Sequence, residues 1–400
     1  MADTLTQPDE ALRLWLSHLR SVSTEALGLE GTAGRVLAES VHADRDSPPH
    51  DVSAMDGYAV RLADLGRERM PVAGEVMTGQ RPPAIAAGTA LRIFTGGCVP
   101  SGADAVIRRE DVQEQDDSFL LRVDPATISA GQNIRRQGEN LRQGDAVVEA
   151  GRGIDAAVAG ALCAFGVAEP RVHRRVRVGV IVTGNELREV NDSVEPWEIR
   201  DSNGSALDTL LRPQPWIELV ERQHVEDEPG RVTEAVAGLL PQCDCLLLTG
   251  GVSMGDHDYV PDAVRAADGK VVFHRIAIRP GKPLLAAVGP HGQAIAGLPG
   301  NPVSVLVTAR VFAAAALRRL AGFAVAEPPR SVVMLDDESP RPLDLWWYRP
   351  VTLQADGTAR SVPCKGSGDV VSAARGDGFV RIPPGETGRG PWPWWPWRMD

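Results

Sequence analysis

The feature that most constrains the fold is a repeated alternation of strand and helix patterns between Val176 and Leu320. The predicted strands are "VRVGVIVTG", "IELVERQHV", "CLLLTGG" and "KVVFHRIAI", and "AIAGLPGNP" opens a long helix that runs to Leu320. Near-continuous apolar strands that alternate with helices are typical of a parallel-rich sheet covered by helices on both faces. Such sheets bind their ligands at the carboxyl ends of the strands, so we look for a site there.

Glycine-containing turns recur at these strand ends. They are "TGNEL", "TGGVSMGDHD", "RPGKP" and "LPGNPVS". Glycine lets the backbone come close to a ligand and point N–H groups at it, which suits a phosphate. One such turn could be a tight turn and nothing more, but their repetition in one α/β region favours an anion site. Ser253 lacks the spacing of a nucleophilic serine and is interpreted as a hydroxyl donor to phosphate.

Charged side chains of both signs fall in the same loops. Glu186, Asp227, Asp256 and Asp258 follow strands and could share a Mg²⁺ ion, although acidic loop residues are often only solvated. His257 is more simply interpreted as a solvent-facing histidine than as a metal ligand.

Cationic residues are expected to oppose these carboxylates. Arg275 and Arg279 are four residues apart, so on a continuous strand they would share one face and point at one anion, with Lys282 beyond. The alternative is surface charge on an edge strand.

The rest of the chain divides by pattern. Residues 8–40 are predicted to be helical, residues 60–124 are β-rich, and the region after Gly322 is predicted to be all-β, ending in an irregular tail "PWPWWPWRMD". Because helical patterns flank the β-rich insert, one domain is expected to form from two chain segments. The expected domains are an elongated linker domain (residues 1–44 plus 134–172), a β-rich insert (45–133), an α/β domain (173–322) and a small C-terminal β domain (323–400).

Composition excludes several classes of protein. A formal charge of −11 argues against nucleic acid or an anionic membrane as the main partner. Five scattered cysteines form no zinc spacing and indicate a reducing compartment. No stretch reaches the roughly 20 apolar residues of a membrane span, and the start is not a signal peptide, so a soluble cytoplasmic protein is expected.

Taken in order, a series of motifs resembles a known family, the molybdopterin molybdenumtransferases (the MoeA and gephyrin E-domain family). The motifs are "SAMDGYAV", "FTGGCVPSGADAVIRRED", "GQNIRRQGEN", "VGVIVTGNEL", "IRDSN", "LLLTGGVSMGDHDYV", "IAIRPGKPL" and "GLPGNPVSV". The resemblance spans nearly the whole chain. It implies the four domains above, with the α/β domain binding molybdopterin and the C-terminal domain a β-barrel, assembled as a homodimer. It also implies that molybdate is inserted into adenylylated molybdopterin with Mg²⁺-dependent cleavage of the pyrophosphate bond, releasing AMP and molybdenum cofactor.

The resemblance also implies roles for particular residues. The implied catalytic residues are Asp56, Thr95, Glu186, Asp227, Asp258, Arg275 and Arg279, of which Glu186, Asp227 and Asp258 would also hold Mg²⁺. The implied substrate-binding residues are Gly250, Gly251, Ser253, Lys282, Pro299, Gly300, Asn301, Ser304, Arg349 and Ser367. Asp56 and Thr95 would reach the site from the partner subunit. Other cofactor-biosynthesis proteins and molybdoenzyme acceptors are the expected further partners.

The chain departs from the family pattern at some positions, and alternatives stay open. Asn185 stands where the family usually has aspartate in T-G-D-E-L, and Asn140 where it has aspartate in G-E-D, which puts metal affinity in question. A molybdopterin adenylyltransferase, which resembles the α/β region alone, and a non-catalytic pterin-binding scaffold are the rival functions. The sequence does not separate molybdate from tungstate.

Overall fold

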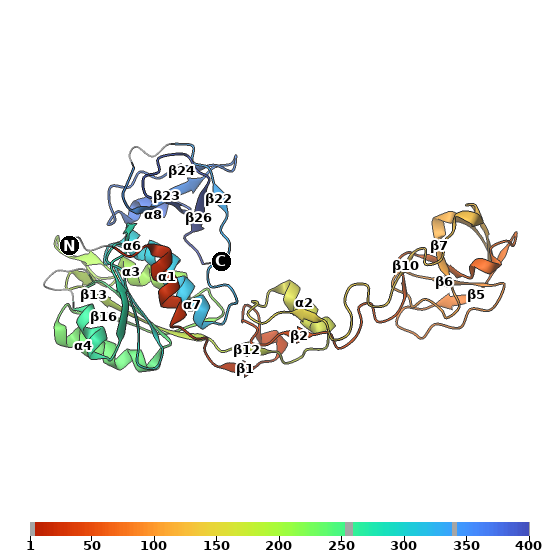
Figure 1. The fold of residues 1–400 in the computed structure, drawn as a ribbon, viewed down its shortest axis with the longest axis horizontal. Helices are drawn as coiled ribbons and strands as arrows, with labels where there is room; N and C mark the ends of the chain where they lie inside the picture. Colours follow the sequence, from red (N-terminus) through yellow and green to blue (C-terminus); the bar gives the residue numbers. More distant parts are fainter. Residues whose placement is uncertain (1–4, 253–258, 338–341, 400) are drawn as a thin grey trace. The chain divides into compact units, whose positions relative to one another are not determined.

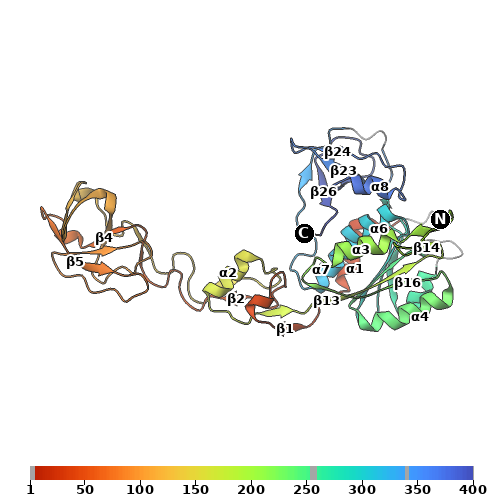
Figure 2. The same ribbon diagram turned by 180° about the vertical axis from the view of Figure 1, so that it is seen from behind.

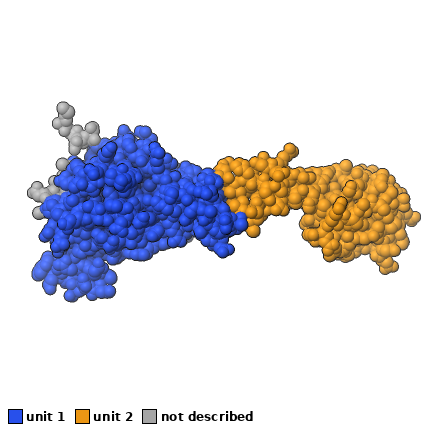
Figure 3. All heavy atoms as spheres, turned by 90° about the horizontal axis from the view of Figure 1, so that it is seen from below, with its two compact units in different colours: residues 1–39, 150–159, 168–400 blue, residues 40–149, 160–167 orange. Residues whose placement is uncertain are grey.

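The computed structural model describes residues 5–252, 259–337 and 342–399. The chain forms two compact units. Unit 1 contains residues 1–39, 150–159 and 168–400, and unit 2 contains residues 40–149 and 160–167 (Figure 3).

The centre of unit 1 is a six-stranded sheet with the order β16-β13-β17-β21-β20-β18. Its strands are β13 (Val176–Thr183), β16 (Ile217–Val225), β17 (Cys245–Thr249), β18 (Lys270–His274), β20 (Leu285–Val288) and β21 (Ala294–Leu298). The surrounding helices are α1 (Pro8–Ser17), α3 (Ser202–Leu211), α4 (Pro229–Leu239), α5 (Val260–Ala266), α6 (Pro302–Thr308) and α7 (Ala314–Leu320).

Strand side chains alternate between two apolar clusters, one on each face of the sheet. Val180 and Leu247 pack with α1, α3, α6 and α7, whereas Ile181 and Leu248 pack with α4 and α5. Figures 1 and 2 show α4 on the opposite side of the sheet from α1 and α3. The prediction of a buried sheet with helices on both faces is therefore confirmed, because the period-two pattern buries both sides of each strand.

The sheet is mixed and not wholly parallel. β16, β13, β17 and β21 run parallel, but β20 is antiparallel to both β21 and β18. The sequence reading missed β20, since its four residues follow a Gly-Pro loop and precede β21 in a short hairpin.

The predicted long helix to Leu320 begins at Pro302 and contains a π-helical segment, Ala309–Ala313, between α6 and α7. Arg310 in this segment is buried and its Nε donates to the carbonyls of Pro396 (3.0 Å) and Arg398 (2.6 Å). The helix is thereby attached to the C-terminal tail.

The C-terminal region forms a second six-stranded sheet in unit 1, with the order β19-β23-β25-β26-β22 and β24 paired to β23. The strands are β19 (Ile278–Arg279), β22 (Val332–Val333), β23 (Trp346–Leu353), β24 (Ala359–Ser361), β25 (Gly378–Ile382) and β26 (Trp392–Pro396). A helix, α8 (Val370–Arg375), interrupts the region, so the all-β prediction was wrong in this detail.

The prediction of an irregular tryptophan tail was also wrong. β26 lies inside the sheet between β25 and β22, and Trp395 stacks on Phe379 with ring centroids 5.7 Å apart. Proline excludes a helix here but tolerates a strand where its missing N–H is not required. Burial of the tryptophan rings, which sequence pattern does not show, selects the strand.

Near the N-terminus, α1 confirms the first half of the predicted helical region, but the second half is not helical. It contains β1 (Thr24–Ala26), which pairs with β12 (Arg171–His173), and a short 3-10 turn, Leu29–Gly31. Gly34 adopts a left-handed φ of 71°, which interrupts any helix. Pairing with a distant segment overrides the local helical propensity.

Unit 2 contains a six-stranded sheet with the order β7-β4-β6-β5-β9-β8. Its strands are β4 (Gly57–Val60), β5 (Met70–Val76), β6 (Ala90–Ile93), β7 (Ala105–Arg108), β8 (Val112–Gln115) and β9 (Ser118–Leu121). Two further pairs join segments that flank this insert in the sequence: β2 (Val41–His42) with β11 (Ala146–Val148), and β3 (Val52–Ser53) with β10 (Ile134–Arg135).

The predicted alanine-rich helix is present as α2 (Ala156–Ala164), and the boundary between the units falls within it. Among the described residues, no helix is long and apolar enough to cross a membrane. The exact domain limits drawn from the sequence stay predictions.

Candidate functional site

The carboxyl ends of three neighbouring parallel strands lie side by side in unit 1. Thr249 at the end of β17 is in register with Val182 of β13 and with Leu298 of β21. The loops after these strands carry the glycine-containing motifs. The sheet therefore brings together segments that are far apart in the sequence, as its parallel direction requires.

A cavity of about 510 Å³ opens at this edge, and we call it the carboxylate cavity. Glu186 and Asp227 line it, as do Asp201, Asn203 and the backbone of Gly250 and Gly251. The structure thus places the predicted Glu186 and Asp227 in one cavity.

Two buried oxygen atoms of this lining have unused hydrogen-bonding capacity. Thr183 and Asn203 are 5% and 7% exposed, and neither Thr183 Oγ1 nor Asn203 Oδ1 finds a hydrogen-bond partner among the described residues. Asn203 Nδ2 donates to Thr249 Oγ1 (3.0 Å) and to the Gly300 carbonyl (2.7 Å), which fixes the direction of its amide oxygen. Buried polar atoms without partners are costly, so a ligand with donors, or a cation, is the natural occupant.

Glycine is required at the end of β17 because two strands approach closely there. Gly250 has φ of 92°, and a Cβ at this position would lie 2.6 Å from both the carbonyl oxygen and Oγ1 of Thr183. The Gly250 N–H donates to the Leu298 carbonyl (3.3 Å). Gly250 therefore supplies close approach to the cavity, while its own N–H is already engaged.

Asn185 contacts Asp227, one of the predicted metal-binding carboxylates, directly. Its Oδ1 accepts a hydrogen bond from the Asp227 backbone N–H at 3.0 Å. An aspartate could accept the same bond, so the asparagine keeps the position of Asp227 and removes one negative charge.

A second cavity, of about 720 Å³, lies between the α/β sheet and the C-terminal sheet of unit 1, and we call it the cationic cavity. It is lined by Arg279, Lys282, Ser304, Arg349 and Ser367, among others. These residues come from β19 and the loop after it, from α6, from β23 and from the segment before α8. The structure therefore gathers into one cavity the predicted oxyanion-binding residues of four chain segments.

Arg349 is the most deeply buried cation of this cavity, at 9% exposure. Its Nη2 donates to Asp337 Oδ2 at 2.6 Å, while its Nη1 is buried and makes no hydrogen bond with any described residue. Burial raises the pKa of Asp337, but the hydrogen bond from Ser361 and the charge of Arg349 more than offset this and hold it below its ordinary value. Arg349 thus carries a donor that an oxyanion could satisfy.

The two cavities share part of their lining. Pro283, Pro299 and Asn301 border both of them. A ligand that extends past these residues would meet carboxylates on one side and cations on the other.

The prediction that Arg275 and Arg279 share one strand face was wrong. β18 ends at His274 in the α/β sheet, Arg275 adopts a left-handed φ of 69°, and β19 with Arg279 pairs with β23 of the C-terminal sheet. Arg279 lines the cationic cavity, and Arg275 lines neither cavity. The chain changes sheets between the two arginines, which no period-two pattern reveals.

Several predicted residues lie outside the described part of the chain. They are Ser253, Asp256, His257 and Asp258.

Asp56 and Thr95 belong to unit 2, where they contact each other. The Thr95 backbone N–H and hydroxyl donate to Asp56 Oδ1 at 2.7 and 2.8 Å. These bonds, the backbone one first, hold the pKa of Asp56 below its ordinary value. The pair therefore presents an exposed carboxylate that stays ionised.

The sequence reading did not assign roles to Asp201, Asn203 or Asp337. Asp201 and Asn203 lie in the "IRDSN" motif, and Asp201 caps α3 by accepting a hydrogen bond from the Gly204 N–H (2.8 Å). The motif was therefore the sequence feature that could have indicated both residues. Asp337 had no comparable signal, because only the tertiary structure places it against Arg349.

The donor set of the carboxylate cavity suits a hard cation. Carboxylate, amide and hydroxyl oxygens are the ligands that Mg²⁺ prefers. Within the described residues, no group of three or more His, Cys, Asp or Glu side chains is placed to hold a metal ion. Glu186, Asp227 and Asn203 Oδ1 are the residues present that fit Mg²⁺.

Comparisons with known proteins place the chain in a family. Residues 6–166 match the MoeA N-terminal region (domain I and II), and residues 179–319 match a probable molybdopterin binding domain. The chain is 36% identical over 315 residues to a molybdopterin molybdenumtransferase of Synechococcus elongatus, covering 76% of this chain and 77% of that protein. It is 31% identical over 378 residues to the protein of that name from Nostoc, covering 91% of this chain and 86% of the relative.

A comparison with solved structures finds the same family. The molybdopterin biosynthesis moeA protein of Pyrococcus horikoshii matches with a TM-score of 0.82 at 28% identity, over 98% of this chain and 99% of that one. The fold is that of the MoeA proteins, and its α/β domain matches the probable molybdopterin binding domain. The chain belongs to the molybdopterin molybdenumtransferase family, which confirms the expectation from the sequence motifs.

Proposed function

We propose that the chain inserts molybdate into adenylylated molybdopterin, cleaving the pyrophosphate bond with Mg²⁺ and releasing AMP and molybdenum cofactor. The observation that carries the proposal is the pair of adjoining cavities of opposite charge that share Pro283, Pro299 and Asn301. A reaction that inserts an oxyanion into a substrate and cleaves the pyrophosphate bond of that substrate is served by a cationic subsite for the oxyanion and a subsite for a divalent ion at the pyrophosphate.

In this proposal the cationic cavity binds molybdate. Arg279, Lys282 and the buried Arg349 neutralise its charge, and the Nη1 group of Arg349 donates a hydrogen bond to one of its oxygens. Ser304 and Ser367 add hydroxyl donors. Tungstate carries the same charge and nearly the same size, so the site would bind it as well.

The carboxylate cavity would hold the pyrophosphate group and the metal. Glu186 and Asp227, with Asp258 from outside the described residues, would hold Mg²⁺ and would orient the attacking water. When bound, the ion supplies charge neutralisation at the pyrophosphate and lowers the pKa of water. Gly250 allows the ester to approach the strand end closely.

The remaining family features are proposed on the same basis. A homodimer would bring Asp56 and Thr95 of the partner subunit to the site, and the C-terminal strands would form the family's small barrel. Molybdenum-cofactor biosynthesis proteins and molybdoenzymes would supply the substrate and accept the product.

The direct test supplies adenylylated molybdopterin, molybdate and Mg²⁺ to the purified chain and follows AMP. We expect AMP release that stops when EDTA removes the metal and returns with added Mg²⁺. Asp227→Asn should slow release by about 10²–10⁴-fold, as loss of a group that handles the attacking water does. The matched control Glu195→Gln changes an exposed carboxylate outside both cavities and should retain the wild-type rate.

Two results would reverse the proposal. Adenylylation of molybdopterin from ATP, without AMP release from the adenylylated substrate, would indicate the adenylyltransferase; the match of residues 6–166 to the N-terminal region speaks against it. Full restoration of molybdoenzyme activity by Asp227→Asn and Arg279→Ala in a strain lacking its own activity would indicate a scaffold.

A further inference from the structure

A third cavity lies at the opposite end of the α/β sheet from the candidate site. It measures about 550 Å³ and is bordered by Arg177 near the start of β13, by the residues that precede β17 and β21, and by the segment that follows α1. Its lining shares no residue with the carboxylate or the cationic cavity. Because the strands are parallel, their amino ends gather here just as their carboxyl ends gather at the candidate site.

The polar lining of this cavity is basic. Arg20, Arg177, His18 and His291 border it, and Asp244 is the one carboxylate among its lining residues, all of which are described. Two arginines on one cavity stand out in a chain with a formal charge of −11. The walls also include the buried apolar side chains of Val22, Cys243 and Leu320.

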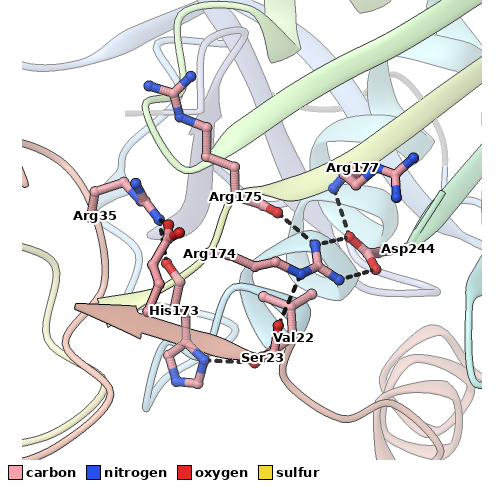
Figure 4. A network of polar contacts seen from close by, with 9 residues as sticks. Val22, Ser23, Arg35, His173, Arg174, Arg175, Arg177 and Asp244 are labelled. Atoms are coloured by element: carbon pink, nitrogen blue, oxygen red, sulfur yellow. Dashed lines mark hydrogen bonds and ion pairs between the residues drawn. The ribbon is translucent and has the colours of Figure 1, made fainter. Parts of the chain in front are cut away.

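Asp244 does not neutralise the lining arginines, because another arginine engages it. Arg174 Nη1 and Nη2 donate to its two carboxylate oxygens at 2.6 and 2.7 Å, and Arg174 does not line the cavity (Figure 4). Arg177 donates only its backbone N–H to Asp244, at 2.8 Å. Figure 4 shows the Arg177 guanidinium pointing away from that carboxylate.

The guanidinium groups of Arg20 and Arg177 therefore stay available for a ligand. Neither forms an ion pair with any residue in the described part of the chain. Glu218 and Glu25 act on Arg174, and Glu221 on Cys243, but none of these carboxylates lines the cavity. Glu218 is in register with Arg177 across β13 and β16 but forms no ion pair with it, so the lining holds two arginines without an ion-pair partner among the described residues, beside two histidines.

We propose that this cavity is a second binding site, for the phosphate group of a small organic phosphate monoester. Arg20 and Arg177 would bind the phosphate oxygens, because guanidinium matches phosphate geometry. The volume falls within the range of about 300–1,000 Å³ of small-molecule sites, and the apolar walls accommodate the organic part. The inference is independent of the proposed function.

The test uses ribose 5-phosphate as the probe, with inorganic phosphate and uncharged ribose for comparison. Phenylglyoxal modification of arginines is followed by peptide mass spectrometry on the full chain, so each arginine is read separately. Ribose 5-phosphate should protect Arg20 and Arg177, and ribose should protect neither. Arg175 is exposed, does not line the cavity and should be modified equally in all samples.

Calorimetric titration of variants provides the second measurement. Arg177→Gln and Arg20→Gln should each weaken ribose 5-phosphate binding by at least about tenfold, the effect of losing one charge-assisted hydrogen bond. Arg175→Gln is the matched control and should bind as the wild type does.

Three outcomes would overturn the proposal: no saturable binding, protection of Arg279 and Arg349 alone, or equal weakening by all three variants. Binding of inorganic phosphate as tight as that of ribose 5-phosphate would refute the role of the apolar walls. AMP release is not measured in either experiment, so failure here is distinct from failure of the proposed function.

Discussion

The carboxylate cavity and the cationic cavity share part of their lining, yet they are built differently. The first is formed by the strand ends of one sheet and the segments that follow them, with Gly368 the single contribution from the C-terminal region. The second needs two sheets, because Arg349 and Ser367 come from the C-terminal region while Lys282 and Ser304 come from the α/β region. The carboxylate side therefore depends on the strand ends of one sheet, and the cationic side depends on packing between two sheets. It follows that the two sides can be disrupted separately.

The largest expected effect comes from Trp395→Ala. Trp395 is 5% exposed and stacks on Phe379 in the sheet that carries Arg349. Removing a buried aromatic ring should lower the free energy of unfolding by about 3–5 kcal/mol. Chemical denaturation measures this change.

If the two cavities are built as described, Trp395→Ala should also raise the KM for molybdate while Mg²⁺ half-saturation stays near the wild-type value. Trp197→Ala removes a tryptophan that is 74% exposed and should change the free energy of unfolding by no more than about 0.5 kcal/mol. Equal loss of metal and molybdate affinity in Trp395→Ala would contradict the separate construction.

Arg349→Gln probes the cationic side directly. Loss of a charge-assisted hydrogen bond should raise the KM for molybdate by about 10–100-fold. Steady-state kinetics at saturating Mg²⁺ measure it. Arg360→Gln is the control, since Arg360 is exposed and lines neither cavity. An unchanged KM in Arg349→Gln would place molybdate elsewhere.

Asn185→Asp probes the carboxylate side by adding a charge, whereas Arg349→Gln removes one from the cationic side. Aspartate can keep the hydrogen bond from the Asp227 N–H and adds one charge beside the proposed metal, so Mg²⁺ half-saturation should fall by roughly twofold to fivefold. Asn191→Asp adds the same charge in an exposed loop outside both cavities and should have little effect. Weaker Mg²⁺ binding in Asn185→Asp would show that the cavity does not hold the cation.

The smallest effect is a pH dependence of stability from Asp337. Its pKa is lowered in the folded chain, so its contribution is present above the unfolded pKa of about 3.9 and is lost as pH falls below that value. Unfolding free energies of the wild type and Asp337→Asn should differ by a constant amount above about pH 5 and converge below about pH 4. A difference that grows on acidification would reverse the sign assigned to Asp337.

The same division separates the residues that sequence patterns predict from those that they do not. Glu186, Asp227 and Gly250 were predictable because parallel strands always bring their carboxyl ends to one edge. The meeting of Arg349 with Ser304 was available only through the family resemblance, because no local pattern relates β23 to α6. The predictions that Arg275 shares a strand face with Arg279 and that the tryptophan tail is irregular were wrong for a related reason. In both places the chain joins a sheet whose other strands lie elsewhere in the sequence.

Local periodicity and glycine placement determined the α/β sheet, its two covered faces and the edge where ligands bind. The tertiary structure alone decided which cations face that edge, because the chain leaves the first sheet at Arg275 and its next strand, β19, pairs with β23 of the second sheet. It also decided that the Asp244 carboxylate pairs with the Arg174 guanidinium, whereas Arg177 lines a separate cavity. A sequence pattern shows the periodicity of one helix or strand. Which distant segment that element pairs with depends on burial and pairing, which exist only in the folded chain.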